Sequence, residues 1–235
     1  MPFQPAFAPS TDPIVRFQQL RTFLSRWFGV SLPPAGGGHA DAERLSRELG
    51  RPLGPAVTEW IALTADLQAP ATCGILRDGR RIADWPEHAC LSLNLQAEQD
   101  VHWAVRYEDL GAEDPPVSMF WRDFDAEPLT FRACDEDTEP TSVTVFGIGY
   151  LLSYTRGSSG FGRSIDDRAR LAEQLEAAGI MGTTVGDIWI GEGEGWFALI
   201  DAMWTEPAFT FTRRGDVDVP PPIAALAGGP GWRMG

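Results

Sequence analysis

Hydrophobic and polar residues alternate in two short runs between Leu91 and Arg106. A period of two is typical of a strand with one buried face, so residues 91–95 and 101–106 are predicted to be strands. The polar residues 97–100 between them suit a hairpin loop. After an acidic turn, Pro115 and Pro116 fix φ and remove two backbone donors, which predicts a short strand over residues 118–121 at or near a sheet edge.

A helical period dominates the chain before this hairpin. Hydrophobic residues recur three or four positions apart in segments bounded by proline or glycine, which predicts helices over residues 12–28, 41–49 and 55–67. Asp78-Gly79 is a hairpin signal, and residues 85–89 are predicted to form a loop.

The second half of the chain predicts further elements of both kinds. The apolar run 143–154 is rich in β-branched and aromatic residues, which favours a strand, but its length and spacing favour a buried helix, the assignment we adopt. Residues 164–167 cap a helix that ends at Gly179. The remaining segments are a short strand at 129–132, a glycine-rich loop at 156–163, and a meander of strands at 187–191, 196–204 and 208–213.

These elements predict an α+β fold with a mixed, mostly antiparallel sheet of about six strands flanked by helices. One domain would span residues 12–214, after an N-terminal extension over residues 1–11. Residues 215–235 are rich in proline and glycine, and we expect them to form a tail outside the core.

Composition changes this picture through charge. The net charge is −14, and every basic residue is arginine because the chain contains no lysine. Such a chain repels nucleic-acid phosphates and favours fast encounter with a basic partner, so no nucleic-acid partner is expected. We find neither a signal peptide nor an apolar run long enough for a membrane helix, which predicts a cytoplasmic protein without membrane partners.

Sequence motifs for catalysis or metal binding are missing. The cysteines Cys73, Cys90 and Cys134 show no C-x-x-C spacing, and His88 with Cys90 lacks the usual pattern of zinc ligands. A phosphate-binding loop would need a lysine, and G-x-S-x-G does not occur. We therefore predict no metal ion, no cofactor and no catalytic residue.

Carboxylates gather around the predicted hairpin. Two of them with separated pKa values could perform acid–base chemistry, which leaves a hydrolase as one alternative. We favour recognition instead, since a carboxylate-rich rim with exposed aromatic residues suits a basic protein partner. Trp103 stands at an alternating position and is expected in the core. The predicted partner-binding residues are Glu98, Asp100, His102, Glu108, Asp109, Asp114, Phe120 and Trp121.

The order of motifs from Asp41 to Arg156 resembles the SUKH superfamily, which includes yeast cell-wall assembly regulators and bacterial immunity proteins. One match is the run Leu91–Val117, with L-x-L-x-L-Q-x-E-x-D-V-x-W-x-V-R followed by D-P-P-V. The other is Leu49–Trp60, which departs from the family in having Gly54-Pro55 in place of Leu-Pro. The motif residues expected to be structural are Leu49, Gly50, Leu53, Trp60, Trp103, Val105, Pro115, Pro116 and Val117.

This resemblance implies a SUKH-like fold and a non-enzymatic binding protein. Its implied role is that of a bacterial immunity protein, which neutralises a cognate toxin by direct binding. A regulatory or scaffold protein that binds other intracellular proteins is the second alternative, and the carboxylate-dependent hydrolase is the third.

Overall fold

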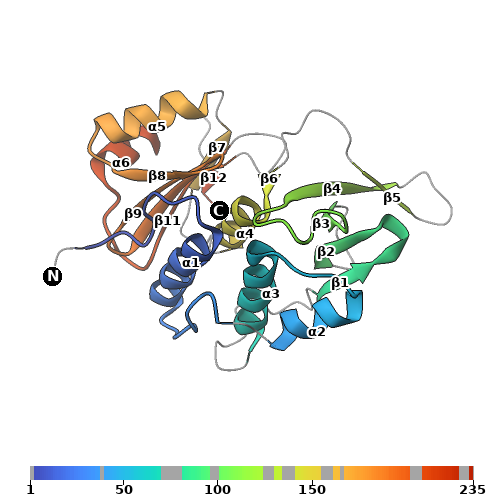
Figure 1. Cartoon of the computed structure of the whole chain (residues 1–235). Coiled ribbons are helices and arrows are strands. Elements are labelled where there is room, and N and C mark those ends of the chain that lie inside the picture. Colours follow the sequence, from blue (N-terminus) through green and yellow to red (C-terminus); the bar gives the residue numbers. More distant parts are fainter. Residues whose placement is uncertain are drawn as a thin grey trace. The chain divides into compact units, whose positions relative to one another are not determined.

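The chain forms two compact units in a computed structural model (Figure 1). Residues 11–144 make up the N-terminal unit, and residues 1–10 together with 145–235 make up the C-terminal unit. The structure describes residues 3–37, 40–69, 81–95, 101–123, 130–133, 141–154, 161–164, 167–201, 208–227 and 233–234. No helix within these ranges is long and apolar enough to cross a membrane.

Three helices open the N-terminal unit, as predicted. They are α1 (Pro13–Phe28), α2 (Ala40–Leu49) and α3 (Pro55–Gln68). Asp12 caps α1 by accepting bonds from the N–H groups of Ile14 and Val15, and Gly29 ends it in the left-handed region at φ 68°. The predicted face of α3 is buried, including Trp60.

An antiparallel sheet completes this unit. Its strands are β1 (Arg81–Trp85), β2 (Cys90–Leu95), β3 (Val101–Arg106), β4 (Pro116–Asp123), β5 (Thr130–Ala133) and β6 (Thr141–Ser142). They follow the order β1-β2-β3-β4-β5, and β6 also pairs with β4. The predicted hairpin and third strand are present, and β4 lies next to the edge strand β5, in agreement with its predicted position at or near an edge. Although Pro116 lacks an N–H, β4 extends beyond it and has neighbours on both sides.

The two faces of this sheet carry different side chains. On one face, the indole Nε1 of Trp60 donates to the carbonyl of Leu93 at 3.2 Å, which attaches α3 to β2. On the other face, Trp85, Cys90, Ala104 and Phe120 form a buried cluster, with Phe131 packed against it. This alternation follows from the period of two in β2 and β3.

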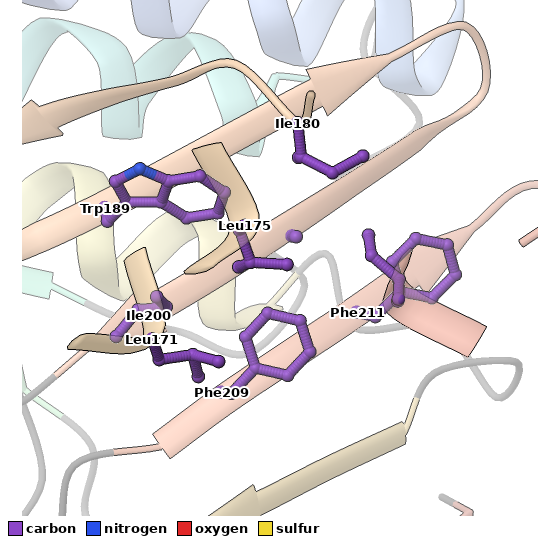
Figure 2. Packing of buried hydrophobic residues seen from close by; sticks show 9 residues of the cluster. Leu171, Leu175, Ile180, Trp189, Ile200, Phe209 and Phe211 are labelled. Atoms are coloured by element: carbon purple, nitrogen blue, oxygen red, sulfur yellow. The ribbon is translucent and has the colours of Figure 1, made fainter. Parts of the chain in front are cut away.

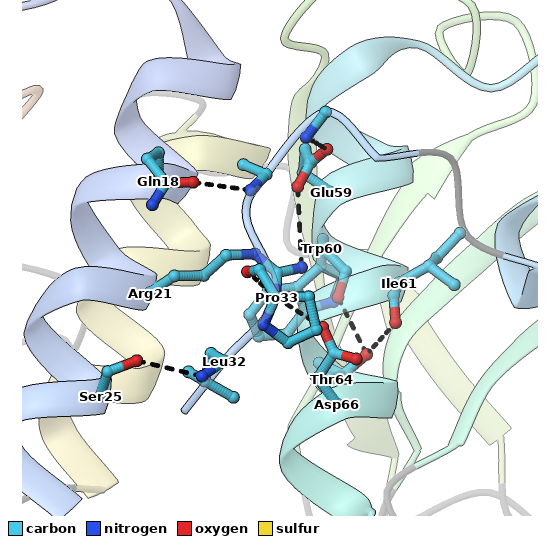
Figure 3. Close-up of polar contacts among 12 residues, drawn as sticks. Gln18, Arg21, Ser25, Leu32, Pro33, Glu59, Trp60, Ile61, Thr64 and Asp66 are labelled. Carbon is cyan, nitrogen blue, oxygen red and sulfur yellow. Dashed lines mark hydrogen bonds and ion pairs between the residues drawn. The ribbon is translucent and has the colours of Figure 1, made fainter. Parts of the chain in front are cut away.

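A buried ion cluster joins α1, α3 and the chain that follows α1 (Figure 3). Arg21 Nη1 donates to Asp66 Oδ2 at 2.5 Å and to the carbonyl of Pro33 at 3.3 Å. Arg21 Nη2 lies 3.7 Å from Glu59 Oε2, and Glu59 Oε1 accepts the N–H of Gly36 at 2.5 Å. The cluster therefore fixes residues 33–36 across the two helices.

The C-terminal unit begins within α4 (Val143–Tyr154), which is helical as predicted. Its other helices are α5 (Arg168–Ala177) and α6 (Pro221–Ala227). Its antiparallel sheet has the order β12-β7-β11-β10-β9-β8. The strands are β7 (Phe161–Ser164), β8 (Gly182–Val185), β9 (Ile188–Gly193), β10 (Trp196–Asp201), β11 (Ala208–Arg213) and β12 (Arg233–Met234).

Side chains from α5, α6 and the sheet form the core of this unit. Leu171 and Leu175 of α5 pack with Trp189 of β9 and with Phe209 and Phe211 of β11 (Figure 2). Ile223 of α6 belongs to the same cluster and is fully buried. The expectation that residues 215–235 form a tail outside the core is therefore wrong. The short apolar stretch P-P-I-A-A-L-A forms helix α6, which contributes Ile223 to this core.

Residues 3–10 also belong to this unit. Glu192 of β9 accepts the N–H groups of Ala6 and Phe7 at 3.1 and 2.9 Å, and Phe7 is only 3% exposed. The α+β class is confirmed, but the single mixed sheet is wrong, because the strands after α4 form a second antiparallel sheet. The sequence pattern had predicted a glycine-rich loop where most of β7 lies, and it had not predicted β8.

Candidate functional site

An open pocket of about 330 Å³ lies at the end of β3 in the N-terminal unit. Three separate segments meet there: the link between α2 and α3, the turn between β1 and β2, and the end of β3 with the turn after it. Its volume is at the small end of ligand pockets, which suits one side chain or a small ligand. The lining residues are Arg51, His88, Ala89, Arg106, Tyr107 and Glu108.

The turn between β1 and β2 is held by backbone bonds. Residues Pro86–His88 form a 3₁₀ turn (η2), and Ala89 ends it at φ 51°, the one positive φ found at a non-glycine residue among those described. This conformation costs an alanine roughly 1–2 kcal/mol. The N–H of Tyr107 donates to the carbonyl of Ala89 at 2.9 Å, and Cys90 pairs with Arg106 across β2 and β3. The backbone of the two lining residues Ala89 and Tyr107 is therefore held in place by hydrogen bonding.

Two contacts hold the side chain of Tyr107, one at its hydroxyl and one at its ring. Its hydroxyl donates to Asp84 Oδ1, and Arg51 Cζ lies 4.9 Å from the ring centroid in a cation–π contact. Burial, together with the hydrogen bond and the negative charge of Asp84, raises the pKa of Tyr107 to about 12. The phenol therefore stays a neutral donor at physiological pH.

Tyr107 is expected to ionise at a higher pH than an unperturbed tyrosine. Because its pKa rises from about 10 in the unfolded chain to about 12 in the folded one, its stabilising contribution is complete below pH ~10 and disappears between these values. The difference in tyrosinate absorbance between wild type and the Tyr107→Phe variant, followed against pH, should have its midpoint at the raised pKa of about 12. Asp84→Asn should lower it, and a wild-type midpoint near the reference value would contradict the contact.

Two arginines supply positive charge to the pocket. Arg51 and Arg106 are both exposed. Neither guanidinium forms an ion pair with any carboxylate in the described ranges, whereas Arg21 and Arg44 each have two carboxylate partners. The side chain of Glu108 lines the same pocket and is also without an ion pair there. The pocket thus presents charges of both signs to solvent.

Comparison with family models, with curated proteins and with solved structures finds no match. The resemblance to the SUKH superfamily therefore rests on the motif residues of this sequence.

The predicted binding residues in the turn between β3 and β4 have two kinds of role. The carbonyl of Leu110 accepts the N–H of Gly54 at 2.7 Å, and that of Glu113 accepts the N–H of Ala56 at 3.1 Å. Asp114 Oδ1 accepts the N–H of Thr144 at the start of α4, at 2.9 Å. Asp114 is therefore structural, while Glu108 and the side chain of Glu113 are exposed and Asp109 is half-buried.

Other predicted binding residues do not join this surface. Phe120 and His102 are each 4% exposed and pack in the aromatic layer on the sheet, so the prediction that Phe120 is an exposed contact is wrong. Alternation with the apolar residues Val101 and Trp103 predicted an outward position for His102, but side chains on both faces of β3 are buried. Trp121 is 40% exposed, but it pairs with Val101 at the opposite end of β3 and β4 from the 107–114 turn. Glu98 and Asp100 lie outside the described residues.

The family-motif residues have mainly structural positions. Trp60, Trp103, Val105, Pro115 and Val117 are buried, as expected of Trp103 in particular. Leu49 and Leu53 are half-buried, Gly50 ends α2 at φ 64°, and Pro116 is exposed.

Cys90 and His88 lie near the pocket but are engaged in packing. Cys90 Sγ lies 3.1 Å from the carbonyl of His88, and burial raises the pKa of the thiol. The imidazole of His88 lies 4.1 Å from the Trp85 ring and 5.2 Å from Phe120, between ring centroids. No group of three potential metal ligands occurs within the residues that the structure describes. Cys73 and Cys134 lie outside them.

Sequence reasoning found Glu108 and missed the arginines that face it. Arg51 and Arg106 stand within the SUKH-like motifs, but they are 55 positions apart and neither spacing nor periodicity connects them.

Proposed function

We propose that this chain is a non-enzymatic binding protein that neutralises a cognate protein toxin by direct binding, the role implied by its resemblance to the SUKH superfamily. The observation that carries the proposal is the pocket surface of the N-terminal unit. Arg51, Arg106 and Glu108 are exposed there and form no ion pairs in the described part of the chain. Charged side chains that form no ion pair within the described part of the chain are available to contact another protein.

Preorganisation supports the same proposal. The turn that carries Glu108 is attached to the start of α3 through Gly54 and Ala56. The N–H of Tyr107 donates to the carbonyl of Ala89, which attaches the end of β3 to the turn between β1 and β2. A surface whose backbone is already fixed loses little conformational entropy on binding. Such a surface suits a docking protein that must hold several charges in register.

The sign of the net charge favours a basic partner. With a net charge of −14, the chain attracts a cationic protein over a distance that salt limits to about 8–10 Å under physiological conditions. Glu108 and Glu113 would meet basic side chains at contact. A basic toxin domain has the complementary charge for both effects.

The proposal predicts that an adjacent gene encodes a basic toxin and that the chain forms a salt-sensitive complex with this toxin. Coexpression of the chain should restore growth of cells that produce this toxin, and the purified proteins should form a complex. The association rate should fall at least severalfold between low salt and physiological salt, because screening removes long-range attraction. Stopped-flow mixing of the two purified proteins measures this rate.

The control separates local from general charge effects. Glu108→Gln with Glu113→Gln should weaken the complex more than Glu43→Gln with Glu173→Gln, which removes the same charge at exposed positions of α2 and α5. No complex with the neighbouring toxin, or a complex that salt leaves unchanged, would refute the proposed function.

A further inference from the structure

Two arginines, Arg51 and Arg106, line the same pocket of this acidic protein. The chain has 33 acidic residues and 19 arginines, so carboxylate partners are abundant. Arg44 on α2 uses two of them, at 3.1 Å each, and Arg21 uses two in the interior. Arg51 and Arg106 use none in the described ranges and share one pocket instead.

Each of the two arginines starts from a well-defined position. The guanidinium of Arg51 lies against the ring of Tyr107, whose hydroxyl is bonded to Asp84. Arg106 is the last residue of β3, and its backbone is in register with Cys90. Both cations therefore stand on fixed elements around a space of about 330 Å³. An arginine presents a planar set of N–H donors that matches a carboxylate.

We propose that this pocket receives a carboxylate side chain, Asp or Glu, of the partner protein. The inference rests on the proposed function and adds the chemistry of one contact. A carboxylate fits better than a phosphate, because Glu108 lines the pocket and Asp84 lies beside it in a chain of charge −14. These negative charges disfavour a dianion more than a monoanion.

This contact would give the interface its specificity. A basic partner is attracted by the whole acidic chain, but only a partner with a carboxylate among its basic residues satisfies Arg51 and Arg106. A partner that lacks it leaves two arginines desolvated and unpaired, which disfavours the complex. The predicted partner surface is therefore basic with one acidic residue at its centre.

The first experiment tests the pocket without the partner. Titration of the purified chain with N-acetylglutamate amide should shift the NMR signals of the Arg51 and Arg106 Nε–H groups to saturation and leave Arg47 unchanged. Arg47 is an exposed arginine of α2 that has no ion pair in the described ranges. Absence of a saturable shift, an equal shift at Arg47, or tighter binding of inorganic phosphate would overturn the inference.

The second experiment uses the complex with the toxin encoded by the adjacent gene. Arg51→Ala and Arg106→Ala should each weaken it about tenfold or more, which is the usual effect of losing a charge-assisted hydrogen bond, while Arg47→Ala should leave it unchanged. If all three variants bind like wild type, the inference fails and the proposed function stands. If wild type itself does not bind, the proposed function fails, and the inference fails with it.

Discussion

Replacement of Arg21 with alanine is expected to lower the free energy of unfolding of the N-terminal unit by about 3–5 kcal/mol, the range for removing one partner of a buried ion pair. Arg21 is 1% exposed, and Glu59 is 2% exposed. Without the guanidinium, the buried carboxylate of Glu59 loses the cation that lies beside it (Figure 3). The cost is therefore mainly that of leaving a carboxylate buried and unpaired.

The effect should extend to the chain that follows α1. Arg21 donates to the carbonyl of Pro33, and Glu59 accepts the N–H of Gly36. Loss of Arg21 removes one of these attachments and weakens the other. Hydrogen exchange of the amides in α1 and α3 measures the stability of the unit, and faster exchange at Gly36 would report the loosened link.

Arg44→Ala is the matched control for this cluster. Arg44 also has two carboxylate partners, but its side chain is 55% exposed, so its loss should destabilise the unit far less than the loss of Arg21. Glu59→Gln combined with Arg21→Met should destabilise less than Arg21→Ala alone, because the buried charge of Glu59 is then removed together with that of Arg21. Equal effects of Arg21→Ala and Arg44→Ala would contradict the burial of the cluster.

The helices were predictable because their signals are local. Asp12 with Pro13, Pro55, and the glycines Gly29 and Gly50 mark ends that the structure places within one or two residues of the prediction. The alternation in β2 and β3 likewise predicted the strands and the burial of Trp103. Periodicity within a segment was enough for these elements.

Properties that depend on distant residues were not predictable in the same way. Strand periodicity says nothing of which sheet a strand joins, so the strands after α4 were assigned to one sheet with those before it. Arg21 and Glu59 are charged, and a hydrophobicity pattern assigns charged residues to the surface. The pocket required three segments to meet, and none of them carries a motif for it.

Gly54 connects the SUKH-like motif to the candidate site. Its N–H donates to the carbonyl of Leu110 at 2.7 Å, and it is the residue before α3. A Cβ at this position would overlap the carbonyl oxygen of Ala112 and lie 2.8 Å from its carbonyl carbon. Because both atoms belong to the backbone, a rotamer change cannot remove the clash. This explains why the chain has glycine before Pro55.

Replacement of Gly54 with alanine is therefore expected to destabilise the N-terminal unit by about 3 kcal/mol, the upper part of the range for overpacking. Relief of the clash requires the 107–112 turn to move, which breaks the bond to Leu110 and displaces Glu108 from the pocket. Urea unfolding measures the stability, and hydrogen exchange at the Gly54 and Ala56 amides locates the change.

Gly111→Ala is the control for this variant, since Gly111 lies in the same turn and its Cβ would meet only Pro52, at 3.6 Å from Cγ. It should change stability by less than about 0.5 kcal/mol, as expected of a surface substitution. A stable Gly54→Ala protein with wild-type exchange at Ala56 would mean that the turn is free to move away from α3. The preorganised surface that supports the proposed binding function would then lose its physical basis, because Glu108 would no longer be held beside Arg51 and Arg106.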